Sequence, residues 1–163
     1  MTMITDPEVI RVPWQTVKKE YDSWIGLTQC ESYVITFLAK HPEYIENNPK
    51  LGGGWNLAGI EVWLRRGPRG PSEEGSRADM IFTREMQIGQ KDYLIIEAKN
   101  DCYEPRLAKG KKQAMVYAKL LADHLGRKFL THNLVIPAVA AVDYPPTGPR
   151  GGLRGGWNCG EEW

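Results

Sequence analysis

Three ionisable residues stand next to short apolar runs in the middle of the chain. Asp79 precedes the run 80–82, and Glu97 and Lys99 follow the run 94–96. Charged side chains in such surroundings are costly to desolvate unless they pair or bind a ligand. Two carboxylates on neighbouring strands offer the oxygen ligands that Mg²⁺ prefers, with water and a substrate phosphate completing the coordination shell. These residue types therefore predict a divalent-metal site that acts on phosphate esters.

Glu97 and Lys99 are two residues apart, so both side chains project from one face of a strand. A metal ion held beside them would lower the pKa of an attacking water and screen the charge of the phosphate. Lys99 would orient or polarise that water, or stabilise the negative charge that develops on the phosphate. We expect Asp79, Glu97 and Lys99 to be catalytic residues of a phosphodiester hydrolase, with Mg²⁺ as the cofactor and Mn²⁺ able to replace it.

Apolar periodicity predicts the elements that must position these residues. Apolar residues recurring at three- and four-residue steps predict helices over residues 14–25, 27–38 and 109–125. Short apolar runs predict strands over residues 57–64, 78–83, 93–98 and 134–144. The polar stretch 84–92 is expected to be a hairpin loop, and Gly126 to end the last helix. Elements in this order predict an α/β domain with a central mixed β-sheet flanked by helices.

The composition is that of one globular domain. The 163 residues are 42% hydrophobic and 25% charged, and the formal net charge of +1 excludes a basic field over the whole molecule, so any nucleic-acid surface must be local. Cys30, Cys102 and Cys159 form no C-x-x-C, which argues against a disulfide framework or a zinc site and favours reduced thiols in the cytoplasm. The longest apolar run, 134–142, contains Pro137 and is too short to span a membrane. We expect a soluble cytoplasmic protein.

The two ends of the chain differ from residues 14–144, which we expect to form the core of the domain. Residues 1–6 resemble the start of β-galactosidase, a sequence that cloning vectors often leave on expressed genes. The N-terminal arm 1–13 is therefore interpreted as partly vector-derived and predicts nothing about the fold. Residues 145–163 are rich in Gly and Pro and have too little apolar surface to fold alone, which predicts a flexible tail.

The ordered set of polar residues resembles the PD-(D/E)xK nuclease superfamily, over roughly residues 27–144. Asp79 heads one expected strand, and Glu97-Ala98-Lys99 supplies the E-x-K of the next. Gln113 and Tyr117 then match the Q-x-x-x-Y motif of the RecB-like branch, on the helix that follows the E-x-K strand. The family's Pro before the first Asp is absent, because Arg77 and Ala78 stand there.

This resemblance implies a restriction-endonuclease-like core and a metal ion held by Asp79, Glu97 and the carbonyl of Ala98. It also implies catalytic roles for Gln113 and Tyr117. In the family an acid from the helix before the sheet often joins the metal site. Glu31 is the candidate here, since it shares a helical face with apolar residues that we expect to pack on the sheet, and Glu20 on the earlier helix is the alternative.

The implied function is hydrolysis of DNA as a RecB-like exonuclease or a repair or recombination nuclease, in a cellular, phage or defence setting. Holliday-junction resolvases and restriction endonucleases share the same core. Contacts to DNA phosphates are expected from two groups of basic residues, which are Arg65, Arg66 and Arg69 in a long loop and Lys109, Lys111 and Lys112 before Gln113. A solvated surface is the alternative interpretation of both groups.

Two other classes of protein fit the same residues. A non-catalytic nucleic-acid-binding module on this fold would keep the basic groups without the chemistry. An enzyme domain of unrelated chemistry would use Asp79 and Glu97 only as ion-pair partners of Lys99, an arrangement worth about 0 to 1 kcal/mol at a surface. Metal binding separates these classes from a nuclease. The sequence leaves open the preferred DNA structure, the polarity of cleavage and the formation of homo-oligomers.

Overall fold

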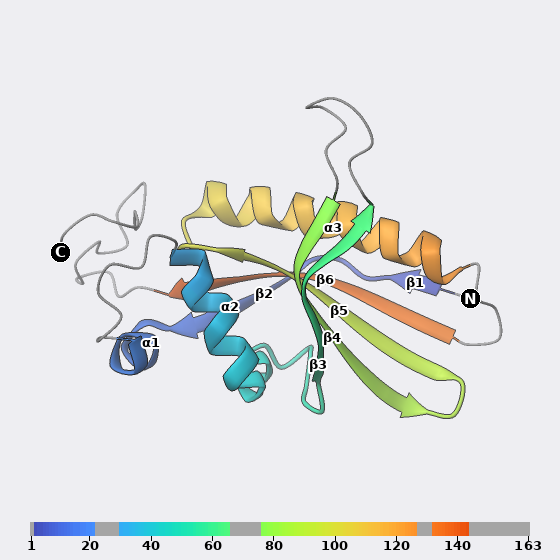
Figure 1. Cartoon of the computed structure of the whole chain (residues 1–163), viewed down its shortest axis with the longest axis horizontal. Helices are drawn as coiled ribbons and strands as arrows, with labels where there is room; N and C mark the ends of the chain where they lie inside the picture. The colour runs from blue at the N-terminus through green and yellow to red at the C-terminus, as the bar shows by residue number, and fades with distance from the viewer. Residues whose placement is uncertain (1, 22–29, 66–75, 127–131, 144–163) are drawn as a thin grey trace.

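We analysed a computed structural model of the chain, which describes residues 2–21, 30–65, 76–126 and 132–143. The described elements form an α/β fold in which a mixed six-stranded sheet is flanked by helices, as expected from the sequence (Figure 1). In chain order the elements are β1 (Thr2–Ile4), β2 (Glu8–Pro13), α1 (Trp14–Tyr21), α2 (Cys30–Lys40), the 3-10 helix η1 (Pro42–Asn47), β3 (Asn56–Arg65), β4 (Ser76–Gln87), β5 (Gln90–Lys99), α3 (Glu104–Leu125) and β6 (His132–Asp143).

The sheet has the strand order β1-β6-β5-β4-β3, and β2 also pairs with β6. Strands β1 and β2 run one after the other along the same edge of β6, parallel to it, with registers that begin at Thr2↔Asn133 and Glu8↔Ala138. Strand β5 is parallel to β6 on the other side, whereas β4 and β3 are antiparallel to their neighbours. Strand β6 is therefore the most enclosed strand of the sheet, which agrees with its nearly continuous apolar sequence.

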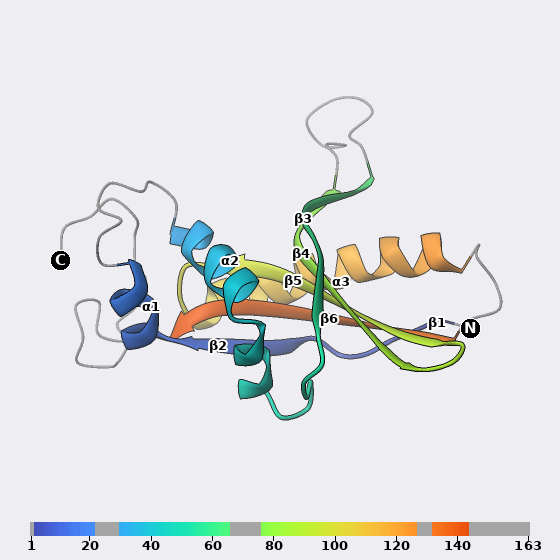
Figure 2. The same ribbon diagram turned by 60° about the horizontal axis from the view of Figure 1, so that its bottom comes forward.

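Helices cover both faces of the sheet (Figure 2). Helix α3 packs on one face, where Ala118 and Leu121 meet Ile95 and Val135. Helices α1, α2 and η1 pack on the other face, where they enclose the larger hydrophobic core. Its largest fully buried side chains include Phe37 and Leu38 from α2, Ile45 from η1 and Phe82 and Ile96 from the sheet.

Strands β4 and β5 separate partway along their length. They pair from the hairpin turn, at Gln87↔Gln90, as far as Met80↔Ile96. Beyond that point β4 continues with β3, while β5 continues with β6 to its end at Lys99 (Figure 1). We call the place where they part the strand fork, and define it by Asp79 on β4 and Glu97 and Ala98 on β5. Backbone N–H and C=O groups lose their strand partners at the fork. Where such groups are buried, side chains must supply their hydrogen bonds.

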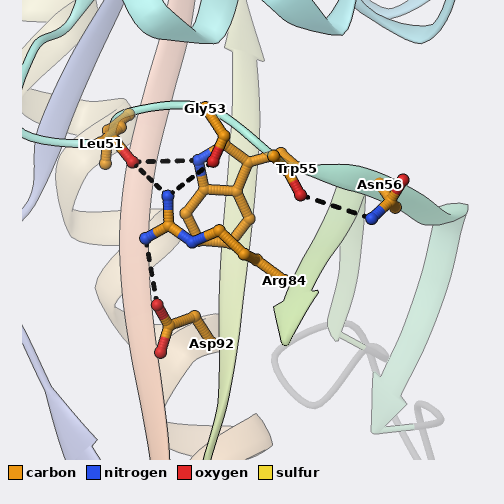
Figure 3. Close-up of polar contacts among 7 residues, drawn as sticks. Leu51, Gly53, Trp55, Asn56, Arg84 and Asp92 are labelled. Atoms are coloured by element: carbon orange, nitrogen blue, oxygen red, sulfur yellow. Dashed lines mark hydrogen bonds and ion pairs between the residues drawn. The ribbon is translucent and has the colours of Figure 1, made fainter. Parts of the chain in front are cut away.

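Arg84 holds the β4–β5 ribbon at its middle, where it pairs with Asp92 (Figure 3). The guanidinium lies 4.0 Å from the ring centre of Trp55, and its Nη1 donates to the carbonyls of Leu51 and Gly53 at 2.7 and 2.9 Å. Its Nη2 forms an ion pair of 3.0 Å with buried Asp92. These contacts join the loop before β3 to the ribbon and fix the base of the hairpin.

The observed elements depart from the sequence predictions in two places. Strands β1 and β2 precede the first helix, where no strand was predicted. Both strands pair with β6, which lies more than a hundred residues later in the chain, so the local sequence does not reveal them. The predicted hairpin loop 84–92 is wrong, since only Ile88 and Gly89 form the turn and Gly89 supplies its positive φ of 82°. Polar residues on both sides of that turn belong to the paired strands β4 and β5.

Helices α1, α2 and α3 agree with the predictions over the described residues, with different ends, whereas the 3-10 helix η1 was not predicted. Helix α3 starts five residues before the expected position, because Pro105 is tolerated in a first helical turn. It ends at Leu125 with Gly126 as its cap, as expected. Residues 22–29 of the first two predicted helices and the tail 144–163 lie outside the described residues. None of the described helices is long and apolar enough to span a membrane.

Candidate active site

Asp79 completes the strand fork with its side chain. Its Oδ2 accepts a hydrogen bond of 2.8 Å from the backbone N–H of Ala98, so a carboxylate takes the place that a strand carbonyl would occupy in a continuous ladder. The register that pairs Met80 with Ile96 places Asp79 opposite Glu97 on the next rung. The two carboxyl groups therefore meet where the strands part, as the sequence predicts for residues on neighbouring strands.

Glu97 is buried, with 8% of its surface exposed, and its Oε2 has no hydrogen-bond partner among the described residues. Burial raises its pKa to about 8, with a further increase from the charge on Asp79, while Lys99 acts in the opposite direction. Burial also raises the pKa of Asp79, against the effects of the Ala98 hydrogen bond and Lys99. Two carboxyl groups that resist ionising together form a site that favours a cation.

The other buried acids of the described residues are held differently. Asp92 pairs with Arg84 at 3.0 Å, and Asp101 lies 3.7 Å from Arg106. Glu97 has no cationic side chain within 4 Å in the part of the chain that the structure describes. An ion pair between Lys99 and either carboxylate of the fork is likewise absent there, so Lys99 acts on them only over a longer distance.

Glu31, in the first turn of α2, is within electrostatic reach of the same fork. Its pKa is raised, mainly by burial and also by the charge on Asp79, whereas Lys99, Arg106 and Lys109 lower it. This electrostatic contact with Asp79 and Lys99 agrees with the expected position of a helix acid at the site. The side chain of the alternative, Glu20, lies outside the described residues.

Helix α3 brings Gln113 and Tyr117 to the site. The pKa of Tyr117 is raised by burial and by the charges on Glu97 and Asp79, so its hydroxyl lies within electrostatic reach of both carboxyl groups. The Oε1 atom of Gln113 is buried and has no hydrogen-bond partner among the described residues. Both residues of the Q-x-x-x-Y pattern thus belong to the helix face next to the fork.

Gly110 allows α3 to approach the sheet closely. A Cβ atom at this position would lie 2.6 Å from Cγ2 of Val139 and 3.3 Å from Cγ of Lys99, so a side chain here would force Val139 or the helix to shift. The helix backbone therefore packs directly on β6 and on the stem of Lys99. This contact restricts the stem of Lys99 from one side.

The three lysines expected to act together do not share one face of α3. Successive residues of a helix are rotated by about 100°, which places Lys109 and Lys111 on opposite sides of buried Gly110. Lys112 points away from the sheet and is exposed. Of the three, Lys109 is the one whose charge lowers the pKa of Glu31. Of the arginines grouped in the sequence, Arg66 and Arg69 lie outside the described residues, as does the side chain of Arg65.

A divalent ion fits the chemistry of the fork. No three His, Cys, Asp or Glu side chains of the described residues are already grouped as metal ligands. Mg²⁺ needs fewer, because it commonly binds through one or two carboxylates and keeps water or substrate phosphate in its remaining positions. Asp79 and Glu97 supply such a pair, and no donor of the described residues reaches Oε2 of Glu97.

Three residues near the fork were not among the candidates from the sequence. The β3–β4 register places Glu61 opposite Asp79, whose pKa its charge raises, and pairs Trp63 with Arg77. Arg77 is two residues before Asp79, so strand alternation alone identifies it as a neighbour on the same side of β4. Glu61 and Trp63 gave no such signal, because their positions depend on how β3 pairs with β4.

Comparisons of the chain with protein-family models, with curated proteins and with solved structures found no match.

Proposed function

We propose that this protein is a metal-dependent deoxyribonuclease with a restriction-endonuclease-like core and a RecB-like site. The observation that carries the proposal is the pair of buried Glu97 and half-buried Asp79 at the strand fork, which has no cationic side chain within ion-pair distance among the described residues. A purely structural carboxylate in such a place would be expected to have a basic partner, as Asp92 and Asp101 do. The missing partner is a divalent cation.

The ion would be held by Asp79, Glu97 and the backbone carbonyl of Ala98, with Glu31 as a further ligand, either directly or through water. Mg²⁺ or Mn²⁺ would supply positive charge that lowers the pKa of water and screens the phosphate. Lys99 lies beside the two carboxyl groups without being paired to them, so its ammonium is free to orient the attacking water and to stabilise charge on the phosphate. Gln113 and Tyr117 position the substrate from α3.

The DNA strand would approach from the side where Lys109 and Arg106 lie, since the charges of both reach Glu31. Such phosphate contacts give affinity without reading the sequence. The Q-x-x-x-Y pattern favours an exonuclease or a repair or recombination nuclease over the junction resolvases and restriction enzymes that share the core. Cytoplasmic action on DNA is part of the same proposal.

The test is cleavage of linear, circular, single-stranded and branched DNA with Mg²⁺, with Mn²⁺ and with a chelator. The wild type should cleave only with metal, and Asp79→Asn and Glu97→Gln should each abolish cleavage. Glu85→Gln, which changes an exposed carboxylate on the same ribbon, is the matched control and should cleave normally. DNA binding by the wild type without cleavage of any substrate would instead identify a non-catalytic binding module.

A further inference from the structure

Trp63 is a large aromatic residue left exposed on β3, with 51% of its surface accessible. It pairs directly with Arg77 across the β3–β4 ribbon, and the guanidinium carbon lies 5.3 Å from the centre of the indole ring. Both side chains therefore stand on one side of the ribbon in a cation–π arrangement. Trp63 belongs to no hydrophobic core cluster of the described residues.

A second Arg–Trp pair at the other end of the same ribbon shows what a structural pair looks like in this fold. Trp55 is only 6% exposed, lies 4.0 Å from the Arg84 guanidinium and donates its indole N–H to the Leu51 carbonyl (Figure 3). Trp63 has a neighbouring cation but is exposed, so packing in a core does not explain why a tryptophan stands at this position. An accessible indole beside a guanidinium offers a flat face for stacking and a cation for an anionic ligand.

The Trp63–Arg77 pair lies next to the proposed catalytic residues. Arg77 is two residues from Asp79 on the same side of β4, a separation of about 7 Å along a strand. Arg77 also lowers the pKa of Tyr117, which Glu97 and Asp79 raise, so Tyr117 is within reach of both the pair and the fork. Figure 2 shows the β3–β4 ribbon extending past the point where β5 leaves it.

Arg77 is available to a ligand in the described structure. Among the described residues its ion pair is with Glu61, 3.9 Å from Nη1, and the side chains of Arg77 and Glu61 are 47% and 57% exposed. Such a surface pair is weak and readily exchanges its carboxylate for a phosphate. The indole offers a flat apolar face and the guanidinium a bidentate anion donor, which together match the base and the phosphate of one nucleotide.

We propose that Trp63 and Arg77 bind an unpaired nucleotide next to the scissile phosphate, with its base stacked on the indole and its phosphate on the guanidinium. The inference rests on the proposed nuclease function and names its substrate class: single-stranded DNA, or a duplex end whose last bases have separated. A base inside a duplex is already stacked on its neighbours and does not present its face to Trp63. Every base has a π face, so recognition is independent of sequence.

The first experiment measures binding of a labelled oligothymidylate, and of its duplex with oligoadenylate, by fluorescence anisotropy with a chelator present. Trp63→Ala should weaken binding of the single strand by roughly 10- to 100-fold, the range of one lost base–aromatic stack, with little change for the duplex. Trp63→Phe should retain most of the affinity. Ile60→Ala, which truncates another exposed apolar residue of β3 with 45% exposure, is the matched control and should bind normally.

Salt dependence distinguishes the two halves of the proposed site. Arg77→Ala should flatten the dependence of log affinity on log salt by about 0.7, the value for one phosphate contact to a single strand. Trp63→Ala should lower affinity at every salt concentration and leave the slope unchanged, because stacking releases no counterions. An unchanged slope in Arg77→Ala would remove the phosphate contact from the proposal.

Cleavage by the same variants separates failure of this inference from failure of the proposed function. Wild-type cleavage with equal single-strand affinity in wild type and Trp63→Ala would overturn the stacking site and leave the nuclease assignment intact. The same result, together with a shift from dimer to monomer in Trp63→Ala, would show that the exposed indole serves contact between copies of the chain. A wild type that neither binds nor cleaves any DNA would overturn both proposals.

Discussion

Replacing Glu97 with Gln should make the metal-free protein more stable at neutral pH. Glutamine has the shape of a protonated glutamic acid and cannot ionise, so Glu97→Gln removes the cost of placing a charge in a buried position beside Asp79. The pKa of Glu97 is about 8 in the folded protein against an ordinary value of 4.5. One pKa unit is worth about 1.4 kcal/mol, so full ionisation of Glu97 costs about 5 kcal/mol, of which about 3 kcal/mol applies at pH 7.

The sign of the pH dependence follows from the same pKa. Because the folded-state pKa is raised, the folded protein retains a proton between pH 4.5 and about 8 that the unfolded chain releases. The free energy of unfolding of the wild type should therefore fall as the pH rises through this window. Glu97→Gln should lose this slope and exceed the wild type in stability by a few kcal/mol at pH 7, while the two proteins become equal at acidic pH.

Urea denaturation of both proteins with a chelator, at several pH values across the window, measures the difference directly. Glu85→Gln removes an exposed carboxylate from the same ribbon and should follow the wild type. Added Mg²⁺ should restore stability to the wild type above pH 7, since it binds the folded state, and should have a much smaller effect on Glu97→Gln. Parallel pH profiles for the wild type and Glu97→Gln would refute the interpretation of Glu97 as a buried acid without a cation.

Other substitutions test the rest of the site and its supports. Lys99→Ala should slow single-turnover cleavage roughly 100-fold or more while metal-free melting changes little, and normal cleavage would remove Lys99 from the mechanism. Gly110→Ala should destabilise the fold by about 1–3 kcal/mol in urea, because the new Cβ meets Val139; an unchanged midpoint would mean that α3 shifts freely. Arg84→Met should cost about 3–5 kcal/mol by leaving buried Asp92 without its cation, and Asp92→Asn in the same chain should recover part of the loss, which thermal or urea unfolding detects.

The sequence predicts the candidate site better than it predicts the sheet around it. Asp79, Glu97 and Lys99 lie on adjacent strands beside apolar runs, and strand periodicity is a local property that needs no knowledge of the fold. The register of Gln113 and Tyr117 on one face of α3 follows in the same way from helical periodicity. Each of these residues is placed by its own element.

Features that depend on pairing between distant segments were not predictable. Strands β1 and β2 are short, and their partner β6 is separated from them by the rest of the domain. Glu61 and Trp63 reach the site only through the register of β3 on β4, which contains two irregularities. The placement of Lys109 and Lys111 on different sides of α3 follows from helical geometry, while their contact with DNA phosphates stays a prediction.

The pairing of β2 with β6 has a consequence for the order in which the protein folds. A ribosome releases β2 long before it releases β6, and β6 is also the neighbour that completes β5. The sheet cannot be completed until residue 143 has left the exit tunnel. Until then the apolar side chains of β3, β4 and β5 that β6 and α3 help to bury remain exposed to solvent. Folding of the nascent chain should therefore depend on how quickly the last strand is made and on protection of those side chains by a chaperone in the meantime.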